Sequence, residues 1–210
     1  MLPAPIEEHE KVGDLLIPVG RLFRPGELGD PPVDPSRLAG LVSAGELEEP
    51  ASGLYWRGPW TRFGRVPPAL RDVVVELYRG VAVGYSGVAA ANGLGLTTQV
   101  PGVLYFAVPG LAEVPFPAEQ RHAVVLVDRA DRPARSSAGL RFIEVTALEA
   151  LDVRDLWWEY GDDRCLSRIA QVLDAAPHGE FDPARLERGG RSEPDSVRAL
   201  LDLVLNRVHG

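Results

Sequence analysis

The sequence predicts an α+β protein, in which a small N-terminal module ending in a β-ribbon precedes a domain with a small mixed sheet and C-terminal helices. Three observations predict this class. Asp34 and Pro35 form a helix start that leads into two short strand patterns. Runs rich in β-branched and aromatic residues recur between residues 103 and 145. Beyond Thr146, apolar residues recur at helical spacing. Strands followed by helices, rather than alternating with them, are typical of α+β proteins.

The N-terminal module is expected to begin with two helices. A weak helix is predicted over residues 6–16. A second helix begins at Asp34, whose carboxylate can accept hydrogen bonds from the first backbone N–H groups, and it ends at Gly45. Its apolar face consists of Leu38, Leu41 and Val42.

A ribbon closes the module. Residues 47–49 and 54–56 are predicted as strands around a turn rich in Pro, Ser and Gly. Helix, helix and ribbon is the order of a winged helix-turn-helix, so we assign residues 1–58 to a domain of that kind. The Pro- and Gly-rich residues 59–68 are expected to form a linker, and residues 69–210 the α+β domain.

The strands of the second domain follow a helix that starts at the Pro67-Pro68 pair. Residues 128–139, which mix Arg, Asp, Pro and Ser, are expected to form a mobile loop between two strands. The strands are predicted at residues 81–84, 103–108, 122–127 and 140–145, with a short edge strand at 114–116.

Helices are expected from Thr146 onward. Thr146 and Glu149 fit a capping box, and Asp182 followed by Pro183 starts a later helix. Two apolar stripes mark the main C-terminal helices: Leu166, Ile169, Val172 and Leu173 in one, and Val197, Leu200, Leu201, Val204, Leu205 and Val208 in the other.

The segment at residues 85–101, Tyr-Ser-Gly-Val-Ala-Ala-Ala-Asn-Gly-Leu-Gly-Leu-Thr-Thr-Gln-Val-Pro, is the most informative stretch. Ser86 can cap a helix, and three alanines follow with high helix propensity and little volume. Gly93 and Gly95 supply a helix stop and a backbone able to take positive φ. We therefore predict a short helix pressed against a neighbouring element, with a rigid exit in which the Gln99 amide binds a nearby backbone. Partner contact through the exit residues is the alternative.

The same segment resembles the Ser-Gly-x-x-Ala-Ala-Asn-x-Leu-Gly-Leu-Ser/Thr-Thr-Gln-Val-Pro signature of AbiEi-family antitoxins, which belong to type IV toxin–antitoxin systems. Residues 53–57, Gly-Leu-Tyr-Trp-Arg, resemble the wing of the N-terminal domain in that family. The resemblance implies an N-terminal winged helix that binds DNA and represses its own operon, in a system of phage defence. It also implies a C-terminal domain that neutralises a nucleotidyltransferase-like toxin encoded next to it. The signature residues proposed for partner contact are Ser86, Asn92, Thr97, Thr98 and Gln99.

Composition and motifs argue against several function classes. No apolar run is long enough to span a membrane, and no signal peptide is visible, so we expect no membrane partner. The single cysteine, Cys165, fits a reducing cytoplasm. The glycine motifs match no dinucleotide fingerprint, P-loop or nucleophile elbow, and the four histidines are scattered. We therefore expect no enzyme, no catalytic residue, no cofactor and no metal.

One acidic group supports an alternative. Carboxylates three and four residues apart on one helix face could hold Mg²⁺ and serve a metal-dependent enzyme. The interpretation we favour is a solvated helix face, with two of the carboxylates capping the next helix. The group comprises Asp152, Asp155, Glu159, Asp162 and Asp163.

Arginines after the ribbon are the candidate DNA contacts. Arg57, Arg62 and Arg65 are interleaved with aromatic residues, in a pattern that either clamps phosphates or packs as a solvated linker. In the presumed recognition helix Arg37 is the only cation. The net charge is −8, and three carboxylates that would repel phosphate follow that helix: Glu46, Glu48 and Glu49. We expect weak operator binding centred on the three arginines.

A further function class stays open beside the antitoxin and the enzyme. The chain could be a stand-alone transcriptional regulator whose α+β domain senses a ligand or oligomerises. An adjacent toxin gene would separate the antitoxin from the regulator, and metal-dependent melting would favour the enzyme. The sequence leaves open the oligomeric state and whether the toxin is bound directly.

Overall fold

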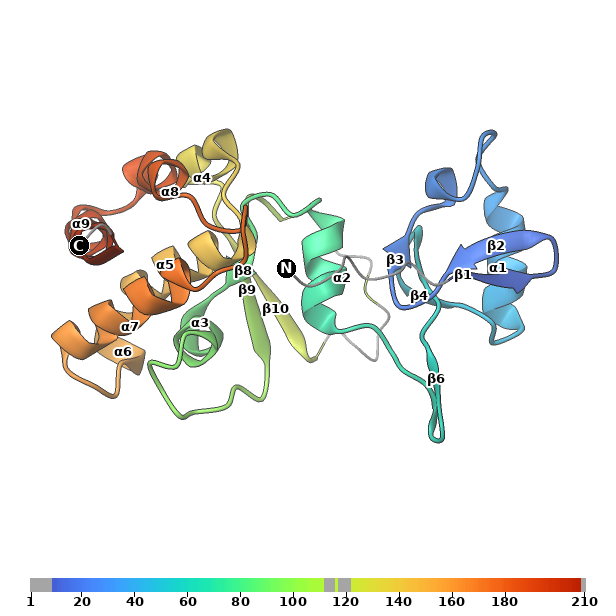
Figure 1. Ribbon diagram of the computed structural model, residues 1–210, viewed down its shortest axis with the longest axis horizontal. Helices are drawn as coiled ribbons and strands as arrows, with labels where there is room; N and C mark the ends of the chain where they lie inside the picture. Colours follow the sequence, from blue (N-terminus) through green and yellow to red (C-terminus); the bar gives the residue numbers. More distant parts are fainter. Residues whose placement is uncertain (1–8, 112–115, 117–121, 209–210) are drawn as a thin grey trace. The chain divides into compact units, whose positions relative to one another are not determined.

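The computed structural model describes residues 9–111, 116 and 122–208, which form a mixed α+β structure (Figure 1). The described residues fall into two compact units: the first comprises residues 9–77 together with Phe116, and the second comprises residues 78–111 and 122–208. The helix α2 (Leu70–Leu77) thus groups with the first unit, whereas the sequence analysis expected the second domain to begin at residue 69. Its buried Val73 and Val74 account for this grouping, because α2 packs against β3 (Leu22–Phe23).

The first unit is built from short strands and one further α-helix. An antiparallel pair, β1 and β2, precedes a three-stranded antiparallel sheet in the order β3-β5-β4. The core of the unit contains Ile17, Phe23, Leu38, Leu47 and Tyr55. The elements are β1 (His9–Val12), β2 (Leu15–Pro18), the 3₁₀ helix η1 (Pro25–Glu27), α1 (Pro35–Ser43), β4 (Glu48–Ala51) and β5 (Leu54–Trp56).

The helix start at Asp34 is confirmed. The Asp34 Oδ1 atom accepts a hydrogen bond from the Ser36 N–H at 2.9 Å, and Pro35 is the first helical residue. The chain leaves α1 through Gly45, whose φ of +73° is a conformation that glycine adopts without strain. The predicted ribbon is confirmed as β4 and β5, with β4 one residue later at its start.

The helix predicted over residues 6–16 is wrong where the structure describes it, because residues 9–18 form the β1–β2 hairpin. Gly13, with φ +64°, lies in the turn between the strands. The hairpin also delivers Ile17 to the core, where it is fully buried. Tertiary burial has therefore overridden a weak local helix pattern. Residues 6–8 of that prediction lie outside the described residues.

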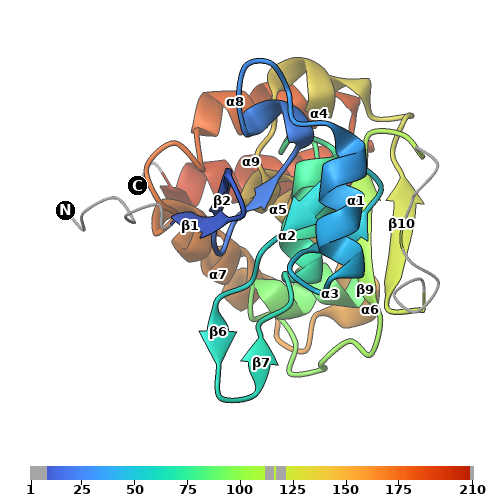
Figure 2. The same ribbon diagram turned by 90° about the vertical axis from the view of Figure 1, so that its right-hand side faces the viewer.

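The expected linker at residues 59–68 contains a second hairpin. Strands β6 (Trp60–Thr61) and β7 (Gly64–Arg65) pair antiparallel, and the turn is held by the Thr61 hydroxyl, which donates to the Gly64 carbonyl at 2.9 Å. Figure 2 shows the two strands side by side as a protruding arm. Pro and Gly punctuate this segment as turn residues rather than as a flexible spacer.

The second unit contains a three-stranded mixed sheet in the order β10-β9-β8. Strand β9 (Leu104–Val108) is parallel to β10 (Val124–Asp128) and antiparallel to β8 (Gly84–Tyr85). The strands predicted at 103–108 and 122–127 are confirmed, and the one at 81–84 is reduced to two residues at its end. Of the predicted edge strand at 114–116, only Phe116 is described, and it lies in no strand.

Helices cover this sheet, and α5 lies at their centre. It packs against β8 and β9 and also against α3, α7 and α9 (Figure 1). The stripes predicted for the last two long helices are confirmed as the buried faces of α7 and α9. The helices are α3 (Gly87–Gly93), α4 (Pro133–Ala138), α5 (Phe142–Asp152), α6 (Arg154–Trp157), α7 (Asp162–Asp174), α8 (Pro183–Gly189), the 3₁₀ helix η2 (Gly190–Ser192) and α9 (Asp195–Val208).

Three predictions around α5 are wrong. Residues 140–145 lead into a helix rather than a strand, because α5 is buried on nearly every side and so lacks an amphipathic period. Thr146 and Glu149 lie within α5 and form no capping box; the Glu144 carboxylate instead accepts the Arg141 N–H at 2.8 Å. The expected loop at 128–139 contains α4, whose Arg135 is buried.

Within the described residues, no helix has both the length and the apolar character needed to cross a membrane.

Candidate functional site

The segment at residues 85–101 is a tightly packed part of the second unit. It leaves β8, forms α3 and exits toward Val100, and Ala90 and Ala91 are fully buried where α3 packs against α5. A Cβ atom added to Gly84, just before the segment, would lie 2.6 Å from the Thr146 backbone nitrogen of α5. The predicted close approach of a small-residue helix is therefore confirmed, and the predicted positive φ is found at Gly95, at +71°.

Ser86 stands at the N-cap position of α3 but does not cap it. Its hydroxyl donates a 2.5 Å hydrogen bond to the Glu149 Oε2 atom, and its side chain accepts no bond from the helix. The capping prediction is wrong because a buried, charged carboxylate on the neighbouring helix attracts the hydroxyl hydrogen more strongly than a neutral acceptor would.

The exit loop after α3 is fastened to Glu159, which precedes α7. The Thr97 hydroxyl donates to Glu159 Oε1 at 2.5 Å and the Thr98 hydroxyl to Oε2 at 3.1 Å. In return, the Glu159 N–H donates to the Leu96 carbonyl at 3.1 Å. The hydrogen bonds from Thr97 and Thr98 lower the pKa of the exposed Glu159. Asn92 adds a long contact of 3.5 Å from its amide to the Thr97 carbonyl.

Gln99 does not play the architectural role predicted for it. Its backbone N–H donates to the Thr97 hydroxyl at 3.1 Å, but its exposed side chain makes no hydrogen bond to any described residue. Val100 beside it is 84% exposed. We call Thr98, Gln99 and Val100 the exit-loop surface: three consecutive exposed side chains on a loop that Thr97 and Leu96 hold in place.

A buried ion-pair cluster lies behind Ser86. Arg135 is only 1% exposed and binds two carboxylates, Glu193 at 2.6 Å through Nε and Glu149 at 2.7 Å through a terminal nitrogen. Arg129 forms a bidentate pair with Glu149, at 2.7 and 2.8 Å, and Arg132 pairs with Glu193. The cluster thus ties α4, α5 and the segments after β10 and η2 together.

Electrostatics in this cluster strongly favour the charged state of Glu149. Burial raises its pKa, but hydrogen bonds from Arg129 and Ser86, with the charges of Arg135 and Arg129, lower it to about 2. The three arginines face four carboxylates, because Asp152 lies 3.7 Å from Arg129 and Asp131 lies 3.2 Å from Arg132, in addition to Glu149 and Glu193. No positive charge is therefore left in excess. This arrangement suits a structural clamp better than an anion-binding site. Sequence analysis missed it, although three arginines spaced three apart, at 129, 132 and 135, were a visible signal.

Two of the candidate DNA-contacting arginines are occupied within the first unit. Arg57 is 6% exposed, and its guanidinium binds Glu10 at 2.7 Å and Glu46 at 2.8 Å. Arg65 donates to the Gly58 carbonyl at 3.0 Å and lies 3.3 Å from the same Glu46 carboxylate. Glu46, which the sequence analysis treated as a charge repelling DNA, is therefore a partner of these arginines. The hydrogen bond from Arg57, together with the charges of both arginines, lowers the pKa of Glu46.

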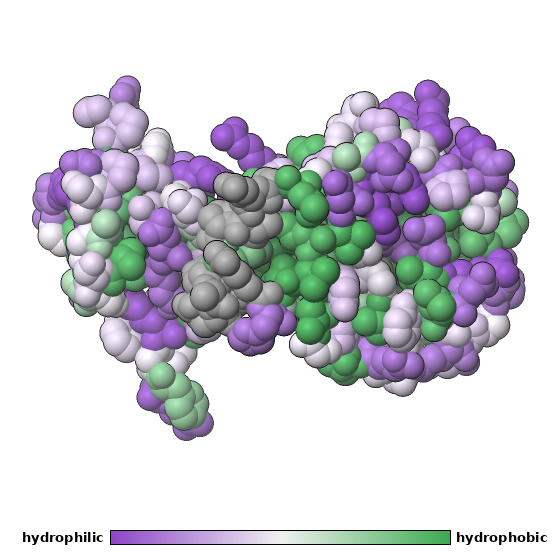
Figure 3. Space-filling model, turned by 180° about the vertical axis from the view of Figure 1, so that it is seen from behind, coloured by the Kyte–Doolittle hydropathy of each residue, from purple (hydrophilic) through white to green (hydrophobic). Residues whose placement is uncertain are grey.

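One exposed basic group of the first unit lies on the β6–β7 hairpin. The Arg62 guanidinium lies 4.6 Å from the centre of the Phe63 ring, and Phe63 is 85% exposed. Arg65 stacks 4.7 Å from the exposed Trp60 ring. The hairpin stands out from its unit, and its end combines hydrophobic and hydrophilic surface (Figure 3). Arg37 is at the surface of α1 and pairs with Asp14.

The acidic group at residues 152–163 is dispersed among different partners. Asp162 pairs with Arg154 at 3.5 Å and Asp163 with Arg207 at 2.6 Å, while Glu159 holds the exit loop. Among the described residues, no group of three or more His, Cys, Asp and Glu side chains is placed to hold a metal ion. Cys165 is fully buried in α7, and burial raises the pKa of its thiol.

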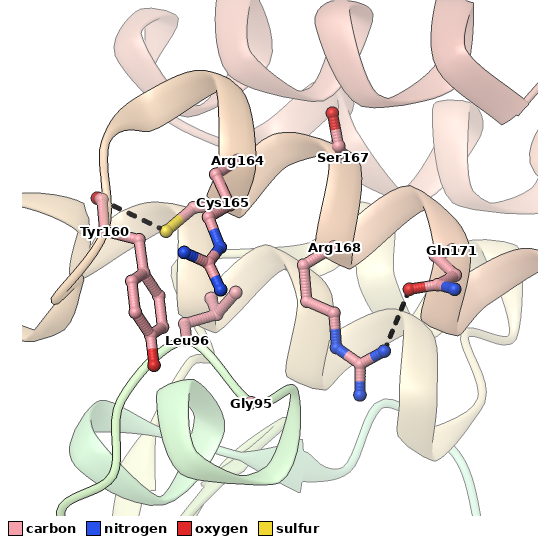
Figure 4. A pocket seen from close by; sticks show the side chains of 8 residues that line it. All are labelled: Gly95, Leu96, Tyr160, Arg164, Cys165, Ser167, Arg168 and Gln171. Carbon is pink, nitrogen blue, oxygen red and sulfur yellow. Dashed lines mark hydrogen bonds between the residues drawn. The ribbon is translucent and has the colours of Figure 1, made fainter.

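A cavity of about 550 Å³ lies between α7 and the turn at Gly95 in the second unit (Figure 4). It is polar on its α7 side, where two arginines and a glutamine line it. The sequence analysis did not identify it, because its walls come from positions about seventy residues apart.

Comparison with known proteins identifies no family. No protein-family model and no curated protein matches the chain. Among solved structures, the chain is similar to the Rv2827c protein from Mycobacterium tuberculosis, with 17% sequence identity and a TM-score of 0.40. The similar region covers 83% of this chain and 66% of that one, just under two thirds of its length. No function is transferred at this level of similarity.

Proposed function

We propose that this chain is the antitoxin of a type IV toxin–antitoxin pair and that it neutralises a nucleotidyltransferase-like toxin. The observation that carries the proposal is the segment at residues 85–101, which resembles the AbiEi signature over most of its length. In this proposal the chain acts by binding and regulation and performs no catalytic step of its own.

The exit-loop surface is the contact we propose for the partner. Thr97 is turned inward onto Glu159, so it serves the scaffold, whereas the side chains of Gln99 and Val100 are exposed. A loop held by hydrogen bonds presents such side chains at low entropic cost to a binding partner. The packing of the loop does not require Gln99 or Val100, because neither side chain is buried.

Co-expression with the neighbouring toxin in a plating assay tests the proposal. We expect the parent chain to restore growth, and a Gln99→Ala, Val100→Ser variant to melt like the parent but protect poorly. Leu156→Ser is the matched control, because Leu156 is 74% exposed elsewhere on the second unit. Equal killing with and without the parent chain would refute the antitoxin function. Full protection by the double variant would refute the surface.

For the first unit we propose the helix-and-wing part of a winged helix-turn-helix that binds operator DNA weakly. Support comes from α1 followed by the β4–β5 ribbon, which is the order of such a module. We place the main phosphate contact at Arg62, because Arg57 and Arg65 are engaged with Glu46. Electrophoretic mobility shifts on the operon's promoter should show that Arg62→Ala weakens binding and flattens its salt dependence. If Arg37→Ala removes binding and Arg62→Ala does not, the contact surface is α1.

A stand-alone ligand-sensing regulator is the second candidate, and the cavity beside Gly95 favours it. The gene next to this one separates the two. A nucleotidyltransferase-type toxin there supports the antitoxin, whereas a regulator would control genes of unrelated function.

A further inference from the structure

The cavity beside Gly95 is lined on one side by two cations from the same helix face. Arg164 and Arg168 lie one turn apart on α7, and Figure 4 shows both guanidinium groups extending toward the Gly95 turn, with Ser167 pointing the other way. The other wall is formed by Tyr160, Leu96 and the turn itself. A volume of about 550 Å³ lies within the range of small-molecule sites.

Neither arginine has a carboxylate partner among the described residues. The Arg164 guanidinium lies 4.3 Å from the centre of the Tyr160 ring and makes no hydrogen bond to a described residue, so its N–H donors are available to a ligand. Arg168 donates from Nε to the Leu94 carbonyl at 3.2 Å and from one terminal nitrogen to Gln171 at 2.9 Å, which fixes its plane and leaves its other terminal nitrogen unused. The contrast with the buried cluster is clear, because each arginine there faces a carboxylate.

Gly95 leaves room for this arrangement. A Cβ atom at Gly95 would lie 3.3 Å from the Arg168 Nε atom, tighter than ordinary van der Waals contact. The turn can therefore approach the arginine closely because it carries no side chain. The same backbone, with φ +71°, is a conformation that other residues adopt only with strain.

From these contacts we infer that the cavity binds a phosphate-bearing small molecule, of the size of a nucleoside triphosphate, through Arg164 and Arg168. The planar fork of a guanidinium matches phosphate oxygens in two parallel hydrogen bonds. The lining carries no acidic residue to compete with such a ligand. Two arginines one turn apart can hold neighbouring phosphate groups, and the prior bonds of Arg168 reduce the entropy lost on binding. This inference concerns the second unit alone and is independent of the antitoxin function.

The test is direct binding to the full-length purified chain by isothermal titration calorimetry, with inorganic phosphate, tripolyphosphate and a nucleoside triphosphate as probes. We expect both polyphosphates to bind and inorganic phosphate to bind more weakly. Arg164→Gln should weaken binding at least tenfold, and its melting temperature should match that of the parent, because Arg164 only stacks on Tyr160. Arg164→Lys keeps the positive charge but lacks the planar guanidinium, so its affinity for the polyphosphates should lie between that of the parent and that of Arg164→Gln. Arg188→Gln, the same change at an exposed arginine of α8, should leave affinity unchanged.

Three outcomes would overturn the inference. Absence of binding by every phosphate probe at millimolar concentration overturns it. Equal weakening by Arg188→Gln and Arg164→Gln would show attraction to overall charge rather than a site. A glutamate-rich peptide that binds through Arg164 while the phosphates do not would assign the cavity to a carboxylate partner. Tighter binding of the nucleoside triphosphate than of tripolyphosphate adds a nucleoside contact to the site, whereas equal affinities restrict it to the phosphate chain.

Discussion

Replacing Glu149 with glutamine should destabilise the second unit. The loss removes a stabilisation that depends on pH, because glutamine does not ionise. Glu149→Gln keeps the size and one acceptor oxygen, but it leaves Arg129 and Arg135 facing a neutral amide in a buried site. The shift of the Glu149 pKa from 4.5 to about 2 corresponds to about 3 kcal/mol of stabilisation by the charged form. Because the folded-state pKa is the lower one, this stability is present above pH 4.5 and is lost as the pH falls toward 2.

Urea unfolding followed by circular dichroism at 222 nm measures the effect, since α3 to α9 of the second unit supply most of the helical signal. At pH 7 the variant should be less stable than the parent by about 3 kcal/mol, and near pH 3 the gap should narrow markedly. Asp163→Asn is the control: Asp163 also pairs with an arginine, but its side chain is 91% exposed, so the change should cost less than about 1 kcal/mol. A Glu149→Gln protein whose stability runs parallel to that of the parent from pH 7 to pH 3 would refute the reasoning.

Three further substitutions probe the same unit by thermal and urea unfolding. Arg135→Met should destabilise the second unit by about 3 kcal/mol at pH 7, because Glu149 and Glu193 lose a shared buried partner. A stability equal to the parent's would mean that Arg129 and Arg132 alone neutralise the two carboxylates. Gly84→Ala should cost about 1–3 kcal/mol or more, since the new Cβ meets the backbone of α5 rather than a movable side chain, and an unchanged melting temperature would contradict this. Ala90→Leu should overpack the contact between α3 and α5 by a similar amount, and a neutral result would show that the helix can move away.

The parts of the fold that the sequence predicted are those with a local physical signal. Asp34 before Pro35 predicted the start of α1, and the stripe including Ile169 and Leu173 predicted α7, because capping and amphipathic spacing are visible without neighbours. The errors occurred where tertiary contacts decide. Residues 142–145 read as a strand because α5, buried on nearly all sides, shows no polar face. The β1–β2 hairpin was missed because it is stabilised by the burial of Ile17 in the core, a contact that the local sequence does not show.

The site divides in the same way. Small residues predicted the close approach of α3, since volume is a property of the residue itself. The sequence could not show which polar groups would be paired. Ser86 and Thr97 turned out to bind carboxylates more than sixty positions away, whereas Gln99 makes no bond with its side chain to the described residues. The sequence also could not show that Arg57 is paired. It was predicted to contact DNA together with Arg62, but in the fold it is buried between Glu10 and Glu46.

The burial of α5 on nearly all sides has a consequence for how the second unit is made. Nine of its eleven residues are buried, and the elements that cover it come from both directions along the chain, β8 and α3 before it and α7 and α9 after it. During synthesis, α5 therefore leaves the ribosome before half of its cover exists, and its apolar surface stays exposed until α9 has been made. Nascent chains halted between residues 152 and 195 should be the forms of this protein that chaperones hold and proteases degrade.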